Sequence, residues 1–497
     1  MVIFASISSA SDIKSDTLFG MQETFFFYDL ETSGINPREQ RIMQFAGQRT
    51  DLSMNPIGDP FNILIKLTED VLPDPDAILV TGITPQQTID DGLTEVEFLK
   101  LFHKEITLPG TIFVGFNTVR FDDEFIRYLH YRNYYDAYQW HWQNGCSRWD
   151  LLDLTRMTRA LRPENIMWPV DSEGKPTNRL ELLTSINNLD HQNAHDALSD
   201  VRATISVAKM LNERQPRLFK YLLKMRDKNE VERLVKSGDR FVYSSGKYSG
   251  DFEKTTIAVY LADNPKSGAL VYDLRFDPTP WLNMSANQLV DAWKWKKDSQ
   301  EPRLPIKTLQ YNRCPAVAPS AVLDDQSKQR LKLDMDEIVK HNQILSNNKK
   351  FVISVLKALE IMNKQQQLAW QADQKLVDGQ LYDGFFKPID KPKMEQIQKI
   401  DSSFINNKPP DFSDNRLNAL WLLYKARNFS DKLDAQDIQQ WDEYRKHKFF
   451  DGDEQSRVSK YFSRIEELAN NKTQNKKQRY LLEDLKLYGE SILPDLS

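Results

Sequence analysis

The chain has 497 residues, which is more than one ordinary hydrophobic core holds, so two to three domains are expected. Its hydrophobic content of 40% and aromatic content of 11% are typical of a packed globular protein and exclude a disordered or fibrous one. The net charge of −5 does not favour a protein that coats duplex nucleic acid, since such proteins are usually basic. An acidic total still leaves room for a local basic channel.

The sequence has no predicted membrane span or secretory signal, and only two cysteines, which together indicate where the protein is located. No apolar run approaches the roughly 20 residues that span a bilayer, so no membrane contact is expected. Residues 1–23 are predicted to be an N-terminal extension, because they lack the basic start of a secretory signal. Cys146 and Cys314 lie far apart and without metal-ligand spacing, which argues against a disulfide framework or a zinc site. We therefore expect a cytoplasmic protein.

Residues 24–214 are predicted to form an α/β domain. The segment 24–30 is a nearly continuous apolar run of strand length, rich in aromatic residues. Thr94 and Glu97 have capping-box spacing and begin an amphipathic helix. Further strands are expected at 41–50, 61–67 and 111–116, and further helices at 121–132, 149–161, 179–188 and 196–212. Strands first, then strands alternating with helices, indicate a mixed sheet flanked by helices.

Two more domains are predicted, at 215–369 and 370–497. The clearest element of the first is a hairpin, with strands at 255–262 and 269–275. Proline-rich segments around it indicate a small β-rich module. From about residue 328 the pattern becomes helical, with helices expected at 328–365, 415–427, 434–447, 454–470 and 475–492.

Two carboxylates stand at the end of the first predicted strand. Asp29 and Glu31 are two residues apart, so their side chains share one face while Leu30 turns to the other. Two carboxylates on a buried strand are costly unless a cation neutralises them. Mg²⁺ is the usual cation for such oxygen ligands. The alternative is a strand end that reaches solvent with an ordinary surface Asp and Glu.

Asp122 and Asp200 each share a helix face with apolar residues. Asp122 aligns with Phe125 and is expected to face the protein, whereas Asp123 is expected to face solvent. His195 precedes Asp200 by five residues, so its side chain can overhang the same cleft. The alternatives are an Asp placed at a helix N-terminus by the helix dipole and a capping or surface His.

These five residues resemble the catalytic set of the DEDDh exonucleases, in the order Asp29-x-Glu31, Asp122, His195 and Asp200. The resemblance implies a ribonuclease-H-like sheet and two Mg²⁺ ions per site, for which Mn²⁺ is expected to substitute. Asp29 would bridge the ions, Glu31 and Asp200 would hold one, and Asp122 the other. His195 would be the general base that deprotonates the attacking water, and Glu31 would also lie near the terminal sugar.

The wider sequence resembles the bacterial exodeoxyribonuclease I family, over nearly the whole chain after the first twenty residues. The similar segments are GFNTVRFDDEF at 115–125, SRWDLLDL at 147–154, NRLELLT at 178–184, NAHDALSDV at 193–201, NRCPAVAP at 312–319, QLYDGFF at 380–386 and YKARNF at 424–429. The resemblance implies an exonuclease domain, an SH3-like domain and a helical C-terminal domain. It also implies 3′→5′ degradation of single-stranded DNA to 5′-mononucleotides in repair and recombination, and a monomer that binds the C-terminal tail of single-strand DNA-binding protein.

Two arginines and a group of aromatic residues are further candidates for the DNA path. By resemblance Arg179, which opens a predicted helix, contacts substrate; the alternative is an ordinary helix-start arginine. Arg162, just before Pro163, is the second candidate. Eight Tyr and Trp residues lie among arginines at 128–149, a composition that grips single strands, although most of them are expected to be core residues.

Two other functions share parts of this pattern. A nuclease acting on short RNA would carry the same five residues, but its catalytic unit does not require the two domains that follow here. A non-catalytic module that only holds DNA ends would be expected to have lost a metal ligand. All four acidic positions and the histidine are present in this chain.

Overall fold

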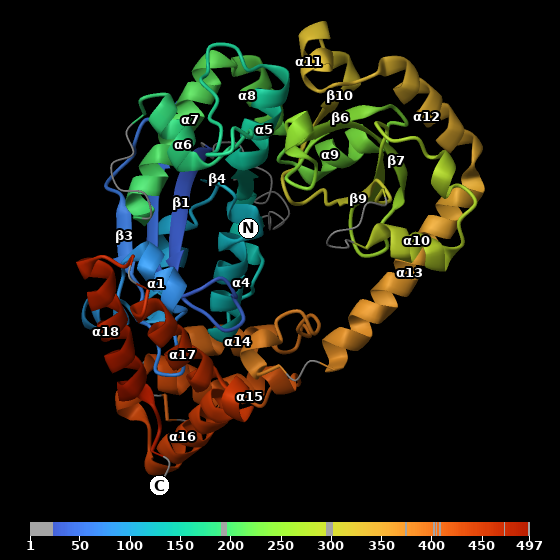
Figure 1. Ribbon diagram of the computed structural model, residues 1–497. Helices are drawn as coiled ribbons and strands as arrows, with labels where there is room; N and C mark the ends of the chain where they lie inside the picture. The colour runs from blue at the N-terminus through green and yellow to red at the C-terminus, as the bar shows by residue number, and fades with distance from the viewer. Residues whose placement is uncertain are drawn as a thin grey trace, which may run out of the picture.

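Three units follow one another along the chain in the computed structural model (Figure 1). A mixed α/β unit comes first, a small second β-sheet unit follows, and a helical unit ends the chain. The structure describes residues 23–189, 196–294, 302–372, 375–400, 403, 405–406, 409–471 and 473–495. Within these ranges no helix combines the length and the apolar character that crossing a bilayer requires.

The first sheet has the strand order β3-β2-β1-β4-β5. Its strands are β1 (Thr24–Thr32), β2 (Ile42–Thr50), β3 (Phe61–Leu64), β4 (Thr111–Gly115) and β5 (Ser147–Asp150). β1 pairs antiparallel with β2 and parallel with β4, and the β2–β3 pair is antiparallel while β4–β5 is parallel. The sheet is therefore mixed, as predicted, with β1 at its centre.

Alternation along β1 separates two cores. Phe25 and Phe27 join the core that contains α5 (Leu151–Leu161) and α7 (Ala197–Arg214). Phe26 joins the core on the other face, with α3 (Glu95–Leu101) and α4 (Asp122–Arg132). The remaining helices of this unit and its junction are α1 (Pro75–Thr81), α2 (Pro85–Asp91), α6 (Leu180–Ile186), α8 (Pro216–Lys224) and α9 (Lys228–Val235).

The second sheet is antiparallel throughout, in the order β10-β6-β7-β8-β9. Its strands are β6 (Phe241–Ser244), β7 (Thr255–Asp263), β8 (Ala269–Asp273), β9 (Ile306–Leu309) and β10 (Ala316–Pro319). The predicted hairpin is confirmed as β7–β8. Its inner residues continue the core of α5 and α7, so the first two units share one apolar interior.

The long helix predicted at 328–365 is wrong in one respect, because the structure divides this segment. The helices of this region are α10 (Ala286–Trp293), α11 (Asp325–Arg330), α12 (Met335–Asn347) and α13 (Lys349–Ala372). Lys332 has a left-handed backbone (φ 51°), and the Asp334 side chain caps α12 by accepting hydrogen bonds from two backbone N–H groups. A capping aspartate inside a helical pattern therefore begins a new helix.

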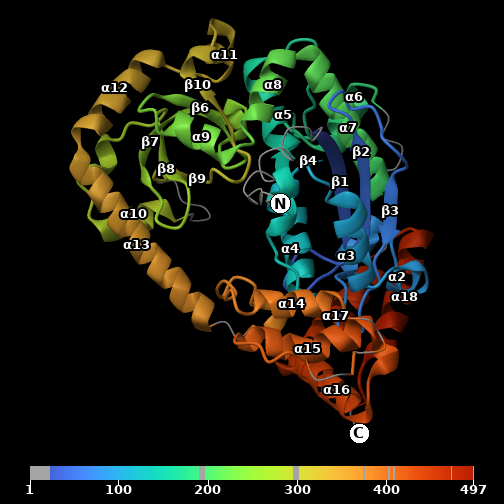
Figure 2. The same ribbon diagram turned by 180° about the vertical axis from the view of Figure 1, so that it is seen from behind.

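The C-terminal unit is helical, as predicted. It contains α14 (Lys391–Gln398), α15 (Asn415–Asn428), α16 (Ala435–Phe450), α17 (Arg457–Ala469) and α18 (Lys476–Ile492). In both views α13 runs from the second unit toward this one, which packs back against the first (Figures 1 and 2). Met43 and Ile78 lie in one core with Phe449 and Tyr488, so the contact is an apolar interface.

Seven buried charged residues join the first and third units, and we call them the interface network. They are Arg41, Asp70, Glu95, Arg132, Asp378, Arg427 and Lys448. Asp70 Oδ2 accepts from Arg427 Nη2 at 2.7 Å and from Lys448 Nζ at 2.6 Å. Burial alone would raise the pKa of Asp70, but the neighbouring cations lower it well below its ordinary value. Every carboxylate of the network has a cation beside it.

Candidate active site

β1 carries the first two candidate carboxylates to a place where the sheet opens. The β1–β4 pairing extends only to Phe27 and Val114, whereas β1 continues with β2 past Glu31. Asp29 and Glu31 thus lie beyond the last residue pair of β1 and β4. Both carboxylates share the face that strand alternation predicts.

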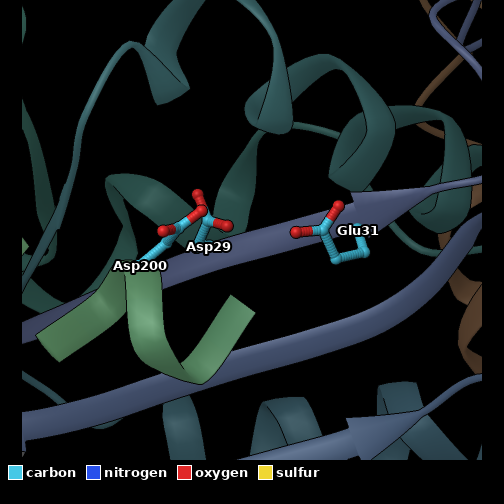
Figure 3. Close-up of side chains that lie close together, drawn as sticks. All are labelled: Asp29, Glu31 and Asp200. Carbon is cyan, nitrogen blue, oxygen red and sulfur yellow. The ribbon is translucent and has the colours of Figure 1, made fainter. Parts of the chain in front are cut away.

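Asp200 completes a group of three. It lies in the first turn of α7, and its carboxylate has an oxygen within 4.8 Å of oxygens of both Asp29 and Glu31. Figure 3 shows the Asp29 and Asp200 carboxylates beside each other, with Glu31 farther along β1. We call these three residues the carboxylate cluster. Three carboxylate oxygens so close together form a donor set that suits a hard divalent cation.

Asp122 begins α4 and is buried, as its apolar helix face predicts. Its charge raises the pKa of Asp29, so the two side chains lie close enough to interact. The turn before it is held by Asp150, whose carboxylate accepts the backbone N–H of Asn117 at 2.9 Å and of Val119 at 3.3 Å. Sequence reasoning missed this positioning residue, although an Asp directly before an apolar helix is a typical N-cap signal.

The prediction that Asp123 faces solvent is wrong. Its side chain is fully buried, accepts a hydrogen bond from Tyr28 Oη at 2.5 Å and pairs with Arg148. A helical-wheel argument considers only α4 itself, whereas these partners come from β1 and β5. Asp123 therefore helps to fix α4 against the sheet.

The described residues that shift the pKa of Asp29 and Glu31 are all acidic. Burial raises the pKa of Asp29 well above its ordinary value, and Asp122, Asp200 and Asp196 raise it further. Burial, then Asp29, Asp200 and Asp196, raise the pKa of Glu31 to about 9. Groups with this much mutual repulsion fit a site for cations.

Asp196 is a second residue that sequence reasoning missed. It caps α7 by accepting the backbone N–H of Ser199 at 3.0 Å, and its charge reaches Asp29 and Glu31. The signal was an Asp three residues before a Ser at the start of an apolar helix. It therefore adds a further negative charge to this edge of the site.

The remaining candidate residues are one histidine and two arginines. His195 lies outside the described residues, and its role as general base stays a prediction. Arg179 precedes α6, is 65% exposed and pairs with Glu181. Arg162 pairs with Asp324 at 3.2 Å and so links the first unit to the second. The DNA-binding roles of both arginines remain predictions.

Most of the aromatic residues at 128–149 are packing residues, as expected. Those buried in the cores are Tyr128, Tyr131, Tyr134, Trp140 and Trp149. Trp142 is 57% exposed, and Tyr135 and Tyr138 are half-buried, so these three are at least partly accessible.

Comparison with known families agrees with this architecture. Residues 26–208 match the family described as Exonuclease, residues 226–360 the Exonuclease I SH3-like domain, and residues 375–492 the Exonuclease I C-terminal domain. These three matches follow the order of the three units and confirm the predicted fold class.

Two relatives are similar to this chain over nearly its whole length. Exodeoxyribonuclease I of Haemophilus influenzae is 37% identical over 482 residues, covering 95% of this chain and 99% of the relative. Exodeoxyribonuclease I of Escherichia coli K12 is 35% identical over 481 residues, covering 95% and 98%.

Solved structures are similar over the same extent. Exonuclease I from Methylocaldum szegediense superposes with a TM-score of 0.88 at 38% identity. A zinc-bound E. coli ExoI–ssDNA complex also gives 0.88, at 35%, and an SSB/Exonuclease I structure with the inhibitor CFAM gives 0.85 at 34%. Each of the three matches covers 95% of this chain and 100% of the other.

Proposed function

The chain belongs to the exodeoxyribonuclease I family, and on that premise we propose that it degrades single-stranded DNA from the 3′ end to 5′-mononucleotides. It is a nuclease with an exonuclease domain, which implies dependence on a divalent metal. The observation that carries the proposal is the carboxylate cluster, whose oxygens lie within 4.8 Å of one another at the end of β1. Relatives solved with single-stranded DNA support the choice of substrate.

The residues present fit a two-ion Mg²⁺ site, for which Mn²⁺ would substitute. Asp29, Glu31 and Asp200 converge, and the buried Asp122 interacts electrostatically with Asp29. When bound, the cations would stabilise negative charge on the attacking and leaving oxygens of the phosphodiester. β1 and the Asp150-held turn keep the carboxylates in place before substrate arrives, which avoids reorganisation during the reaction.

The proton and the substrate end are assigned to other residues. We assign His195 as the base that takes the proton of the attacking water, because an imidazole titrates near neutral pH. Glu31 would also contact the terminal sugar, and Arg179 and Arg162 would contact the strand. These assignments rest on the resemblance of the motifs.

The biological setting is proposed from the relatives. An exonuclease I relative has been solved in a structure with SSB, which supports binding of the C-terminal tail of single-strand DNA-binding protein. We place the enzyme in the cytoplasm, as a monomer that acts in DNA repair and recombination. Two alternatives, a nuclease for short RNA and a non-catalytic end-binding module, are separated by the test below.

The test uses single-stranded DNA labelled at its 5′ or its 3′ end, with Mg²⁺, beside duplex DNA and RNA. We expect 3′ label to leave at once as mononucleotide and 5′ label to shorten stepwise, with both reactions stopped by EDTA. Asp29→Asn should abolish the reaction, while Glu105→Gln, at an exposed carboxylate outside the cluster, should not. Binding without hydrolysis would favour the end-binding module, and preference for short RNA would favour the other nuclease.

A further inference from the structure

We propose that Glu124 is a positioning residue, through which the second and third units hold Asp122 in the geometry that a divalent cation requires. This inference deepens the proposed function and rests on it. Glu124 lies in the first turn of α4, two positions after Asp122. Because both residues belong to one helical turn, contacts that fix the Glu124 side chain also fix the backbone that carries Asp122.

Each of the three units contributes a partner to the Glu124 carboxylate. Arg313 Nη2 of the second unit pairs with Glu124 Oε1 at 3.2 Å. Tyr382 Oη of the third unit donates a hydrogen bond to Glu124 Oε2, and Arg127 of α4 itself pairs with Oε1 at 2.6 Å. In both views α4 lies on the side of the first unit that faces the other two (Figures 1 and 2). Glu124 is therefore a point at which all three units meet.

The second unit also holds the turn before α4. Arg313 Nη1 donates to the carbonyl of Val119, which lies in that turn, at 3.4 Å. Beside it, Arg148 Nη2 donates to the Asn312 carbonyl at 3.0 Å, while Nη1 of the same arginine pairs with Asp123. The loop between β9 and β10 is thus bonded to the chain both before and within the first turn of α4.

The surroundings of Glu124 distinguish it from a surface ion pair. Its side chain is 16% exposed, and both of its carboxylate oxygens accept hydrogen bonds. Partners of this kind, one step removed from a metal ligand, orient the ligand and affect how tightly the metal binds. Docking of the second and third units is therefore coupled to the geometry of the metal site.

The test measures the affinity of the full-length protein for Mn²⁺ without DNA, by electron paramagnetic resonance. Arg313→Gln and Tyr382→Phe each remove one partner of Glu124, and each should raise the Kd for Mn²⁺ about 10-fold. The sign is informative for Arg313→Gln, because removing a cation near a cation site would by charge alone strengthen metal binding. Tyr382→Phe removes a single oxygen and no charge, so it tests the same contact with little risk to folding.

A double-mutant cycle tests whether both partners act through Glu124. Glu124→Ala should itself weaken Mn²⁺ binding. In the Glu124→Ala background, Arg313→Gln and Tyr382→Phe should each change the Kd by less than about twofold, because the carboxylate that they hold is gone. Effects that add fully to that of Glu124→Ala would contradict the proposal.

Asp76→Asn is the matched control. Asp76 also lies in the first turn of a helix of the first unit, α1, and it pairs with Arg464 of the third unit at 2.7 Å. Because α1 carries none of the candidate site residues, the Kd for Mn²⁺ should equal that of the wild type. An equal loss for Asp76→Asn, or a wild-type Kd for both Arg313→Gln and Tyr382→Phe, would overturn the proposal.

Kinetics separate this inference from a direct contact with DNA and from failure of the proposed function. At subsaturating Mg²⁺, Arg313→Gln should lower kcat on oligothymidylate severalfold and leave KM unchanged. A raised KM with unchanged kcat and unchanged Kd for Mn²⁺ would make Arg313 a strand contact and contradict the inference. If the wild type binds Mn²⁺ but hydrolyses nothing, the proposed function fails, while the Kd values of the variants still decide the inference.

Discussion

The carboxylate cluster and the interface network both bury acidic side chains near the first sheet, and their electrostatics are opposite. In the cluster, burial and neighbouring carboxylates raise the pKa of Asp29 and Glu31. In the network, burial acts in the same direction on Asp70 and Asp378, but cations more than offset it and lower the pKa. The same desolvation thus leads to opposite results according to what surrounds the group.

The difference separates a binding site from a structural joint. The network brings four cations and three carboxylates together from within the chain, so its charges are satisfied when the units dock. In the cluster, by contrast, the groups that act on the pKa of Asp29 and Glu31 are burial and other carboxylates, an environment that suits cations from solution. Buried charge by itself therefore says little about function, whereas buried carboxylates that raise one another's pKa indicate a cation as ligand.

The largest expected effect is on activity, from Asp29→Asn. Losing one carboxylate from the centre of the cluster should lower kcat by at least about 10⁴-fold, or about 5.5 kcal/mol of transition-state stabilisation. Stability without metal should not fall, because the substitution removes like-charge repulsion. Steady-state kinetics measures the change in kcat, and urea unfolding measures the stability without metal. A large loss of stability would place Asp29 in a structural role instead.

The reverse pattern is expected for Asp70→Asn in the interface network. It removes the negative charge between Arg427 and Lys448 and leaves buried cations undercompensated, which should cost about 3–5 kcal/mol of unfolding free energy. Under native conditions kcat should stay close to that of the wild type. Asp431→Asn, at an exposed carboxylate paired with Lys432, is the control and should leave the urea midpoint unchanged. An unchanged urea midpoint for Asp70→Asn would show that the interface network does not stabilise the fold, and would contradict the contrast with the carboxylate cluster.

The two clusters should also respond oppositely to pH. The pKa of Glu31 is raised to about 9, so its contribution to stability is present below its ordinary pKa and is lost as pH rises toward 9. Divalent metal should therefore raise the melting temperature more at pH 8 than at pH 5. At a free metal concentration of 100 Kd, the metal stabilises the folded protein by about 2.7 kcal/mol.

The interface network should determine how the stability changes at acid pH. The lowered pKa of Asp70 means that its contribution is present at neutral pH and is lost as pH falls through the folded-state pKa, below about 3.8. Thermal unfolding measured across pH, with metal and with EDTA, should show stability falling at both alkaline and acid pH. Asp29→Asn should reduce only the fall at alkaline pH. Metal stabilisation that is equal at pH 5 and pH 8 would count against the raised pKa values.

The smallest effects should come from the two candidate arginines, Arg162 and Arg179. Arg162→Gln breaks a partly exposed pair with Asp324, so its unfolding free energy should change by less than about 1 kcal/mol. Arg179→Gln should weaken DNA binding less than tenfold, through loss of one phosphate contact. Filter binding would measure the DNA affinity of Arg179→Gln, and urea unfolding would measure the stability of Arg162→Gln. A stability loss as large as that of Asp70→Asn would show that exposed pairs here behave like buried ones.

The local sequence pattern was sufficient to predict which way the acidic side chains of β1 and Asp122 of α4 point. Alternation places Asp29 and Glu31 on one face, and the apolar stripe of α4 turns Asp122 inward. Patterns of this kind also predicted an α/β unit, a small β-rich unit and a helical unit in that order, whereas the ribonuclease-H-like and SH3-like folds were implied by the family resemblance.

Partners distant in sequence could not be predicted. Asp123 was expected at the surface, yet Tyr28 from β1 and Arg148 from β5 cover it. In the interface network, Asp70 and Lys448 are 378 positions apart, and no local spacing announces such a pair. A single sequence shows which side chains share a face, but not which other element arrives to neutralise them.

Calorimetric titration of the metal-free protein with Mg²⁺ at pH 8, in two buffers of different ionisation enthalpy, tests the central claim most directly. If burial and mutual repulsion keep protons on Asp29 and Glu31 until cations bind, Mg²⁺ should bind and release protons, and Asp29→Asn should lose both signals while Asp70→Asn keeps them. Absence of binding, or binding without proton release that survives Asp29→Asn, would contradict the account.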